Sequence, residues 1–206
     1  MITLLSDERI SSIPVKECRQ PLCETDDGRG GSVLVRAGVA RRLAGARRML
    51  SPVGILVVHE GLRRIGRQRA LFADYLAELR DLYPNAERAE LRSLCSRFVA
   101  PVDVAPHVAG AAVDVSLSDP DGNPIDLGTP IDASPESSAG ACYFATGGIS
   151  GEARSFRDIL AWAMCASGFV NYPTEWWHWS YGDRYWAYTV ASPVALYGPL
   201  GEGEEE

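Results

Sequence analysis

PHVAGAAVDVSL, residues 106–117, combines a β-strand pattern with two side chains that are unusual in such a setting. A valine stands on each side of Asp114, and the side chains of a strand alternate between its two faces. If the valines face the core, Asp114 faces the other side, where burial of an unpaired carboxylate is costly. Asp114 therefore needs a partner, and a metal ion is one such partner. His107 lies seven residues earlier, and Gly110 allows a sharp turn between the two.

A second unusual segment, TEWWHWSYGDRYW, covers residues 174–186. Glu175 precedes His178 by three residues, and aromatic residues surround both. On an ideal strand, positions i and i+3 point to opposite faces, so a shared site requires a bend or bulge near residues 173–176. Pro173 favours such an irregular entry into the strand. The aromatic residues predict a site poor in water, in which charges interact more strongly.

Two histidines and one carboxylate are typical ligands of catalytic zinc, which keeps a further position open for water. Such a site makes water a nucleophile near neutral pH. Glu175 is a carboxylate that is not needed as a ligand, and it would move the proton. Each segment alone has an ordinary alternative, because single histidines are often hydrogen-bonded residues and aromatic clusters are often core packing. Together, the two segments favour a metal site formed by His107, Asp114 and His178.

The first half of the chain predicts helices and one strand. Apolar residues recur every three or four positions in three segments, which is typical of amphipathic helices. These helices are expected over residues 35–50, 65–82 and 87–98. VGILVVH, residues 53–59, predicts a strand that is buried on both faces. Residues 1–30 are rich in turn formers and charges, and we expect them to form an irregular N-terminal lead-in.

The second half of the chain predicts a different pattern, with strands on either side of a long loop and a helix. A strand is expected over residues 113–117, and residues 119–151 predict a loop because they are rich in Gly, Pro, Asp and Ser. A loop of this length is often functional. Ser150 can cap a helix over residues 151–167. The aromatic segments 175–181 and 185–191 predict a β-hairpin.

The order of these elements indicates the fold class. Helices come first and most strands later, without regular alternation, which is typical of an α+β fold. We therefore expect helices packed on one side of a small, largely antiparallel sheet. No internal repeat is visible, and we expect one domain over residues 1–206. Residues 201–206, GEGEEE, predict a disordered acidic tail.

Composition excludes several classes of function. The formal net charge of −7 disfavours nucleic-acid binding, which needs a basic surface. No run of about 18 apolar residues predicts a membrane span, and the first residues lack the basic region of a signal peptide. We therefore expect a cytoplasmic protein that does not bind membranes. The five cysteines agree with this expectation, because their number is odd and no C-x-x-C occurs.

The pattern H-x6-D, followed much later by E-W-W-H, resembles that of the D-alanyl-D-alanine dipeptidases, the VanX-type zinc peptidases. Their wider relatives include zinc D,D-carboxypeptidases and the hedgehog signalling domain. The resemblance covers about residues 35–192 and implies a hedgehog/D,D-peptidase-like fold with one zinc ion per chain. It implies that His107, Asp114 and His178 bind the zinc, and that Glu175 is the catalytic base.

Two further roles are implied by the same resemblance. The family places an arginine soon after the early strand, typically within G-Y-R-P, and Arg63 in HEGLRRIGRQRAL matches it. Arg63 would stabilise the oxyanion that forms on the scissile carbonyl, although a loop salt bridge is the ordinary alternative. Family members also use a loop aspartate to hold the ammonium group of the dipeptide. Asp132 in LGTPIDAS matches this aspartate by position.

Several positions around the substrate depart from the family pattern. Leu62 and Arg64 stand where the family has tyrosine and proline, and Ala105 and Val108 stand where it often has serines. The resemblance implies hydrolysis of a small free dipeptide such as D-Ala-D-Ala, with a role in cell-wall metabolism. Three alternatives stay open: another small amide in a natural-product pathway, a muropeptide D,D-carboxypeptidase, and a non-catalytic zinc-binding module.

Overall fold

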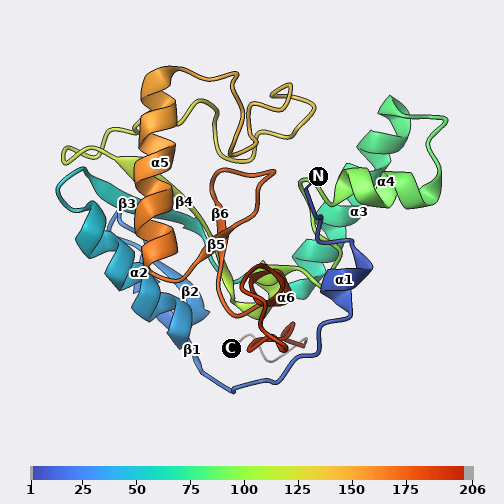
Figure 1. Ribbon diagram of the computed structural model, residues 1–206, viewed down its shortest axis with the longest axis horizontal. Helices are drawn as coiled ribbons and strands as arrows, with labels where there is room; N and C mark the ends of the chain where they lie inside the picture. The colour runs from blue at the N-terminus through green and yellow to red at the C-terminus, as the bar shows by residue number, and fades with distance from the viewer. Residues whose placement is uncertain (1, 202–206) are drawn as a thin grey trace.

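A computed structural model describes residues 2–201 of the chain (Figure 1). The strands are β1 (Leu22–Asp26), β2 (Ser32–Arg36), β3 (Ile55–Glu60), β4 (Ala112–Ser118), β5 (Val170–Asn171) and β6 (His178–Ser180). The helices are α1 (Glu8–Ser11), α2 (Ala37–Leu50), α3 (Ile65–Leu82), α4 (Arg88–Cys95), the 3-10 helix η1 (Pro106–Ala109), α5 (Gly151–Ala166) and α6 (Arg184–Thr189). An antiparallel four-stranded sheet has the order β3-β4-β6-β5, and β1 pairs with β2 in a separate antiparallel sheet.

The main core lies between the four-stranded sheet and the helices α2 and α5. These two helices lie side by side over one face of the sheet (Figure 1). Their buried apolar residues recur every three or four positions and so share one side of each helix. They are Val39, Leu43, Ala46, Leu50, Leu160, Ala163 and Met164. From the sheet, Val113 and Val115 face this core, as the alternation around Asp114 predicts. The predicted α+β class is confirmed.

Most predicted elements are present. The helix predicted over residues 65–82 is α3, with the same bounds. The helix predicted over 151–167 is α5, and Ser150 caps it by accepting a hydrogen bond from the amide of Ala153. Four further elements are present with shifted ends, namely those predicted over 35–50, 53–59, 87–98 and 113–117. Periodicity therefore located the elements that contribute most of the core.

The prediction of an irregular segment over residues 1–30 is wrong. Helix α1 lies within it and is capped by Asp7, whose side chain accepts a hydrogen bond from the amide of Arg9. Strand β1 follows and pairs with β2 through the turn at residues 27–31. Gly28 in this turn has a φ of +83°, which glycine adopts at little cost. The residues that suggested irregular structure thus form a helix cap and a hairpin turn.

The prediction of a β-hairpin from residues 175–181 and 185–191 is also wrong. Most of the second segment lies in helix α6. The carboxylate of Asp183 caps α6 by accepting hydrogen bonds from the amides of Tyr185 and Trp186. This cap outweighs the preference of aromatic residues for strands. β6 pairs instead with β4 and with β5, a two-residue strand that the sequence pattern did not reveal.

Residues 119–150 form the predicted long loop. It carries an isolated β-bridge between Ser118 and Pro124, and α5 fixes its later part. The buried guanidinium of Arg157 in α5 donates hydrogen bonds to three carbonyl oxygens of the loop at 2.7–2.9 Å, those of Leu127, Ala141 and Tyr143. Because these buried and part-buried carbonyls have partners, the loop can keep a fixed course without secondary structure.

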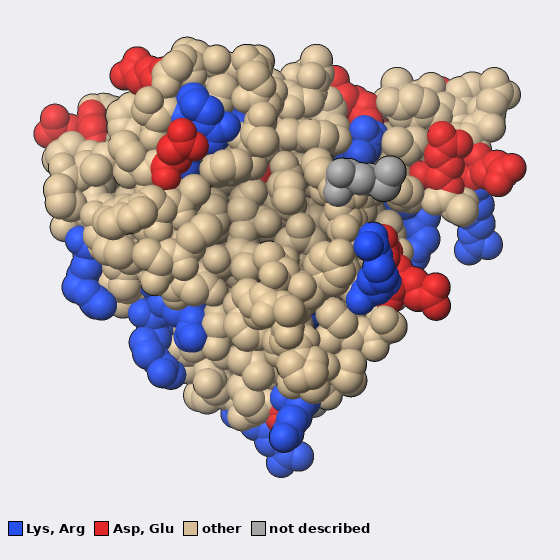
Figure 2. Space-filling view, viewed as in Figure 1, with Lys and Arg blue, Asp and Glu red and all other residues tan. Residues whose placement is uncertain are grey.

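Helices α3 and α4 pack against each other on the other side of the molecule from α2 and α5 (Figure 1). Their shared cluster of buried residues is Tyr75, Leu79, Leu91, Cys95 and Val99. On the face shown in Figure 2, charged side chains lie mostly around the rim and the centre is largely uncharged. No helix of residues 2–201 is long and apolar enough to cross a membrane. All five cysteines are free, and the predicted acidic tail lies outside the described residues except for Gly201.

Candidate metal centre and active site

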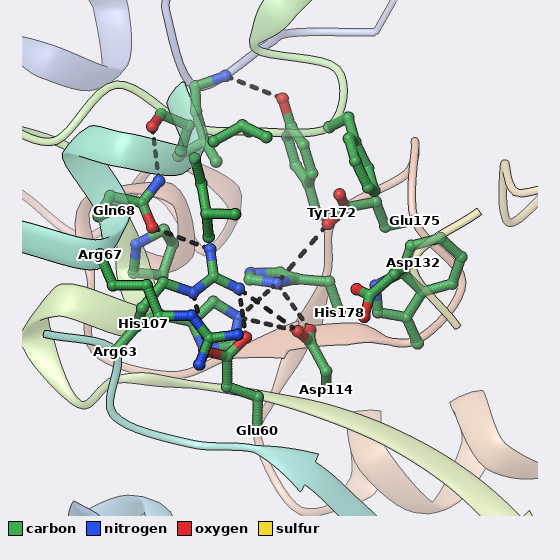
Figure 3. Close-up of a pocket in the computed structure, with 18 residues that line it drawn as sticks. Glu60, Arg63, Arg67, Gln68, His107, Asp114, Asp132, Tyr172, Glu175 and His178 are labelled. Carbon is green, nitrogen blue, oxygen red and sulfur yellow. Dashed lines mark hydrogen bonds and ion pairs between the residues drawn. The ribbon is translucent and has the colours of Figure 1, made fainter. Parts of the chain in front are cut away.

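Three polar side chains lie in a row across the sheet, on the face opposite the main core. Glu60 of β3 is opposite Asp114 of β4, and Asp114 is opposite His178 of β6. Directly opposite residues of neighbouring antiparallel strands place their side chains on the same face. Strand pairing therefore brings two carboxylates and one imidazole together from three distant parts of the sequence (Figure 3).

A β-bulge makes this row possible. Val58 is opposite Val115, but the next pair in the register is Glu60 with Asp114, so His59 is the extra residue. The imidazole of His59 is exposed, and its Nε2 lies 2.7 Å from the hydroxyl of Ser116. The prediction that this strand is buried on both faces is therefore wrong at both ends, because Ile55 and His59 are exposed and only Leu56, Val57 and Val58 of β3 are buried. The bulge places Glu60, rather than His59, beside Asp114.

His107 reaches the same place from η1, which directly precedes β4. Gly110 ends η1 with a φ of +63°, a left-handed conformation that favours glycine. A Cβ atom at Gly110 would also lie only 2.9 Å from a side-chain carbon of Leu22. This tight turn brings Nε2 of His107 to 3.3 Å from Oδ2 of Asp114.

Donor atoms of the three side chains converge on one point. Nε2 of His107 lies 3.1 Å from Nδ1 of His178, which lies 3.1 Å from Oδ1 of Asp114. The potential ligand atoms of the three residues all lie within 4.8 Å of one another. Ligands about 2.0–2.2 Å from a tetrahedral ion are separated from each other by roughly 3.3–3.6 Å. The observed spacing is close to that of a metal site.

Hydrogen bonds alone do not satisfy this cluster. Nδ1 of His107 donates to the carbonyl oxygen of Gly61 at 2.8 Å, which leaves the lone pair of its Nε2 facing the other two residues. Nε2 of His178 is buried and has no hydrogen-bond partner in the described part of the chain. Two imidazoles and a carboxylate are ligands that zinc prefers. The residues therefore fit a zinc ion.

The charges within the cluster also suit metal binding. Burial would raise the pKa of Asp114, but the two imidazoles hold this pKa well below its ordinary value. Burial lowers the pKa of His178 against the opposing effect of Asp114. Burial also lowers the pKa of His107, but the charge and hydrogen bond of Asp114 outweigh this effect, so the pKa of His107 is raised. Asp114 is thus held ionised and His178 is held neutral, which are the states that ligands need, whereas the raised pKa of His107 favours a proton that a bound metal would displace.

Glu175 lies beside the cluster, on the turn that precedes β6. The amide of Glu175 donates to the carbonyl of Tyr172, and the amide of His178 donates to the carbonyl of Glu175. These hydrogen bonds form a bend close to residues 173–176, where the sequence predicted one. The bend places Oε2 of Glu175 3.7 Å from Nδ1 of His178. Burial, followed by the charge of Asp114, raises the pKa of Glu175 well above its ordinary value. A carboxylate with a raised pKa is a stronger proton acceptor.

Arg63 enters the site from the turn between β3 and α3, and its guanidinium is held on two sides. Glu60 accepts hydrogen bonds from Nε, at 2.9 Å, and from Nη2. Gln68 accepts from Nη1 at 2.9 Å, and it is itself buried and donates to the carbonyl of Ala100 at 2.8 Å. Nη2 of Arg63 lies 4.0 Å from Oδ2 of Asp114. The salt bridge of Arg63 is thus part of the site.

A cavity of about 220 Å³ lies over the cluster, and Figure 3 shows the residues that line it. Asp132, from the long loop, lines one side of it, and Arg67 of α3 lies on another. Burial is the largest cause that raises the pKa of Asp132, and nearby carboxylates add to it. Asp132 also has a φ of +61°, which is uncommon for a residue other than glycine and is often found at functional sites.

All six residues that the sequence suggested for the site line this cavity, although they come from separate elements. They are Arg63, His107, Asp114, Asp132, Glu175 and His178. Sequence reasoning missed Glu60 and Gln68, which hold Arg63. Glu60 had a usable signal, because it is a carboxylate three residues before an arginine at the end of a strand. Gln68 had none, since its role depends on the way α3 is oriented.

Comparison with known proteins assigns the chain to a family. The model of the peptidase family M15, described as D-ala-D-ala dipeptidase, matches residues 29–194. The chain belongs to this family. As a family member it is a peptidase, and the cluster of His107, Asp114 and His178 is one that could hold its metal.

Individual relatives of this peptidase agree with the family match. A D-alanyl-D-alanine dipeptidase of Synechocystis sp. is 29% identical over 91% of this chain and 94% of its own length. One of Enterococcus faecalis is 32% identical over 53% of each chain. A crystal structure of the vancomycin-resistance D,D-pentapeptidase VanY in complex with Zn(II) has a similar fold. Its TM-score is 0.50, with 15% identity over 89% of this chain and 90% of that one.

Proposed function

We propose that this peptidase hydrolyses a small free dipeptide, with D-Ala-D-Ala as the first candidate, through a zinc ion and the general base Glu175. The observation that carries the proposal is the convergence of His107, Asp114 and His178 at 3.1–3.3 Å beside a buried Glu175. The substrate is supported by the two curated relatives, which are both named D-alanyl-D-alanine dipeptidase.

Glu175 carries the proton in this proposal. A bound zinc ion makes water more acidic and polarises a peptide carbonyl. Glu175 accepts the proton that water loses as its oxygen adds to the carbonyl carbon. It then gives this proton to the leaving amine as the C–N bond breaks, so one water is consumed and two amino acids are released. Burial is the main reason that the pKa of Glu175 is raised, and a raised pKa helps its carboxyl group to hold the proton between these two steps.

Arg63 and Asp132 position the substrate at two ends of the cavity. They lie on opposite sides of Asp114 and His178 (Figure 3). The N–H groups of Arg63 stabilise the negative charge that develops on the carbonyl oxygen, and losing such a donor typically costs on the order of 10²–10³ in rate. Asp132 pairs with the ammonium group of the free dipeptide, because its carboxylate lines the cavity at an edge that is open to solvent.

A different small dipeptide is the second candidate substrate, because one departure from the family pattern lies in the cavity wall. Ala105 lines the cavity and offers no hydroxyl group to a ligand. Leu62, Arg64 and Val108 do not line it, and Val108 is fully buried. The change at Ala105 therefore alters substrate recognition and leaves the metal cluster and Glu175 intact.

Zinc content measured together with a dipeptide panel tests the proposal. We expect one zinc ion per chain and faster hydrolysis of D-Ala-D-Ala than of its L-L and mixed-chirality isomers. Glu175→Gln should keep the zinc and lose about 10²–10⁴ in turnover, whereas His178→Ala should lose the zinc. Full activity of Glu175→Gln would remove Glu175 from the mechanism. A zinc-loaded wild type that cleaves no dipeptide would favour a binding module.

A further inference from the structure

The long loop that carries Asp132 is joined to α3 and α4 through one glutamate. Oε2 of Glu136 accepts a hydrogen bond from the hydroxyl of Tyr75 in α3, and Oε1 forms an ion pair with Arg97, just after α4. The hydroxyl of Tyr83 lies 3.5 Å from the same Oε1. We call these contacts of Glu136 with Tyr75, Tyr83 and Arg97 the Glu136 bridge.

The Glu136 bridge is largely shielded from water except at Tyr83, which is 39% exposed. The side chains of Glu136 and Arg97 are 17% and 21% exposed, and Tyr75 is buried. Burial, followed by the hydrogen bond to Glu136, raises the pKa of Tyr75, so its hydroxyl stays a donor. Charge-assisted hydrogen bonds of this kind are stronger than pairs on the open surface. The bridge can therefore fix the position of the loop.

The bridge lies directly behind the wall of the cavity. The ring of Tyr75 packs edge-on against Phe98, with 5.1 Å between ring centroids. Phe98 lines the cavity, as does Leu71, one helical turn before Tyr75. On the other side, Glu136 follows Asp132 by only four residues. The bridge therefore ties the wall that carries Asp132 to the wall that carries Phe98.

Asp132 lines one edge of this small space, where the residue itself is exposed. The cavity of about 220 Å³ is below the roughly 300–1,000 Å³ typical of drug-sized ligands. A peptide extended at its amino end has a neutral amide where a dipeptide has its ammonium group. Such an extended peptide would leave Asp132 without a cation, and its extra residues would need space between the loop and α3. Selection by such unfavourable contacts is a common source of specificity.

We propose that the Glu136 bridge limits substrate length, because it holds the loop against α3 and α4 so that the cavity ends at Asp132. The inference rests on the proposed dipeptidase function and concerns the choice between free dipeptides and longer peptides. A D,D-carboxypeptidase of muropeptides needs an open groove at this end of the site. The Glu136 bridge closes it, and residues far from the reacting atoms thus determine which class of peptide enters.

Three variants separate the contacts of the bridge. Glu136→Ala removes them all, and Tyr75→Phe removes one hydroxyl while keeping the ring against Phe98. Glu136→Gln keeps an acceptor oxygen and should retain most of the selectivity. Asp158→Ala is the matched control, because Asp158 forms an exposed ion pair with Arg154 on α5, 3.0 Å apart and outside the cavity lining.

The test compares kcat/KM for D-Ala-D-Ala, N-acetyl-D-Ala-D-Ala and the tripeptide L-Ala-D-Ala-D-Ala. The acetyl group removes the ammonium charge, whereas the tripeptide adds length and keeps an ammonium group. We expect the wild type to discriminate against the tripeptide. Glu136→Ala and Tyr75→Phe should raise the tripeptide-to-dipeptide ratio by at least about tenfold, the scale of one lost charge-assisted hydrogen bond. The ratio for Asp158→Ala should equal that of the wild type.

Amide hydrogen exchange over residues 132–140 supplies a second readout. Faster exchange in Glu136→Ala together with the changed ratio supports the length limit. Faster exchange with an unchanged ratio overturns it, as does a wild type that cleaves both peptides equally well. If the wild type cleaves no dipeptide, the proposed function fails, and calorimetry of the two peptides with the zinc-loaded protein tests the bridge alone. Equal affinities of the wild type for both would then overturn the inference.

Discussion

Gln68 carries no charge, yet it fixes the direction of the Arg63 guanidinium through Nη1. Replacing it in Gln68→Leu removes this acceptor and leaves the Glu60 contact in place. We expect kcat for D-Ala-D-Ala to fall by about 10- to 100-fold, less than after loss of Arg63 itself, because the donor is displaced rather than absent. KM should change little.

Steady-state kinetics and zinc content check this expectation together. Gln68→Glu is the matched control, since it keeps an acceptor oxygen at the same place and should lose less activity. A Gln68→Leu variant with wild-type kcat would show that Glu60 alone positions Arg63.

Glu175 also makes the stability of the metal-free protein depend on pH. Burial, followed by the charge of Asp114, raises the pKa of its carboxyl above 4.5, the ordinary value that it takes in the unfolded chain. Above that pH the unfolded chain releases a proton that the folded state keeps, so stability falls as pH rises towards the folded pKa. The Glu175→Gln variant has no ionisable group at this position, so it should not lose stability in this way as pH rises.

Thermal unfolding with a chelator, from about pH 4 to about pH 8, measures the effect. The variant should be more stable than the wild type by a margin that grows from pH 4.5 upwards. Added zinc should reduce the margin, because a nearby cation favours the ionised carboxylate. A margin that is the same at every pH would contradict this account of Glu175.

Arg157 supports the long loop in the same way that a strand partner would support an edge strand. Arg157→Met would keep an apolar stem in the core but leave the carbonyls of Leu127, Ala141 and Tyr143 without their donor. We expect a loss of roughly 2–4 kcal/mol in unfolding free energy, since one buried and two part-buried carbonyls would lose their donor. Urea denaturation measures this loss. Arg80→Met, at an exposed position on α3, is the control and should change stability little.

The sequence predicted the elements whose own pattern is strong. Helix α3 has a long apolar periodicity, and α5 has both a periodicity and the Ser150 cap. The pattern failed where a single polar side chain decides between two structures. Asp183 caps a helix in a segment whose aromatic residues favour strands. Asp7 caps α1 in a segment that was expected to be irregular. Aspartate is also common in turns, so residue type alone does not identify Asp7 and Asp183 as caps, whereas Ser150 directly precedes a clear helical periodicity.

The molecule as a whole should fold without its metal. The main core lies on the face of the sheet opposite His107, Asp114 and His178, so removing an ion from the cluster leaves the core packed. We expect a chelator to abolish activity reversibly and to leave the circular dichroism nearly unchanged. At a free zinc concentration of about 100 times Kd, binding adds about 2.7 kcal/mol, or roughly 5–11 °C in Tm. Loss of secondary structure on chelation would contradict this.

The site was partly predictable because chemistry limits what a few rare residues can do together. Three histidines occur in the chain, and two of them stand near carboxylates in unusual segments, which pointed to the cluster. The residues that hold Arg63, and the Glu136 bridge, could not be found in this way. Glu136 contacts Tyr75 across 61 positions, and only the packing of α3 against the loop brings them together.

The extra residue in β3 has a consequence for how this sequence tolerates change. His59 could become many other residues, since its side chain lies outside the site. If β3 kept all its residues but paired with β4 without the bulge, His59 would lie opposite Asp114 and the side chain of Glu60 would turn to the apolar face of the sheet. Arg63 would then lose its carboxylate anchor, although His107, Asp114 and His178 would be unchanged. The backbone register of β3, more than the identity of residue 59, therefore decides whether Arg63 is held in the site.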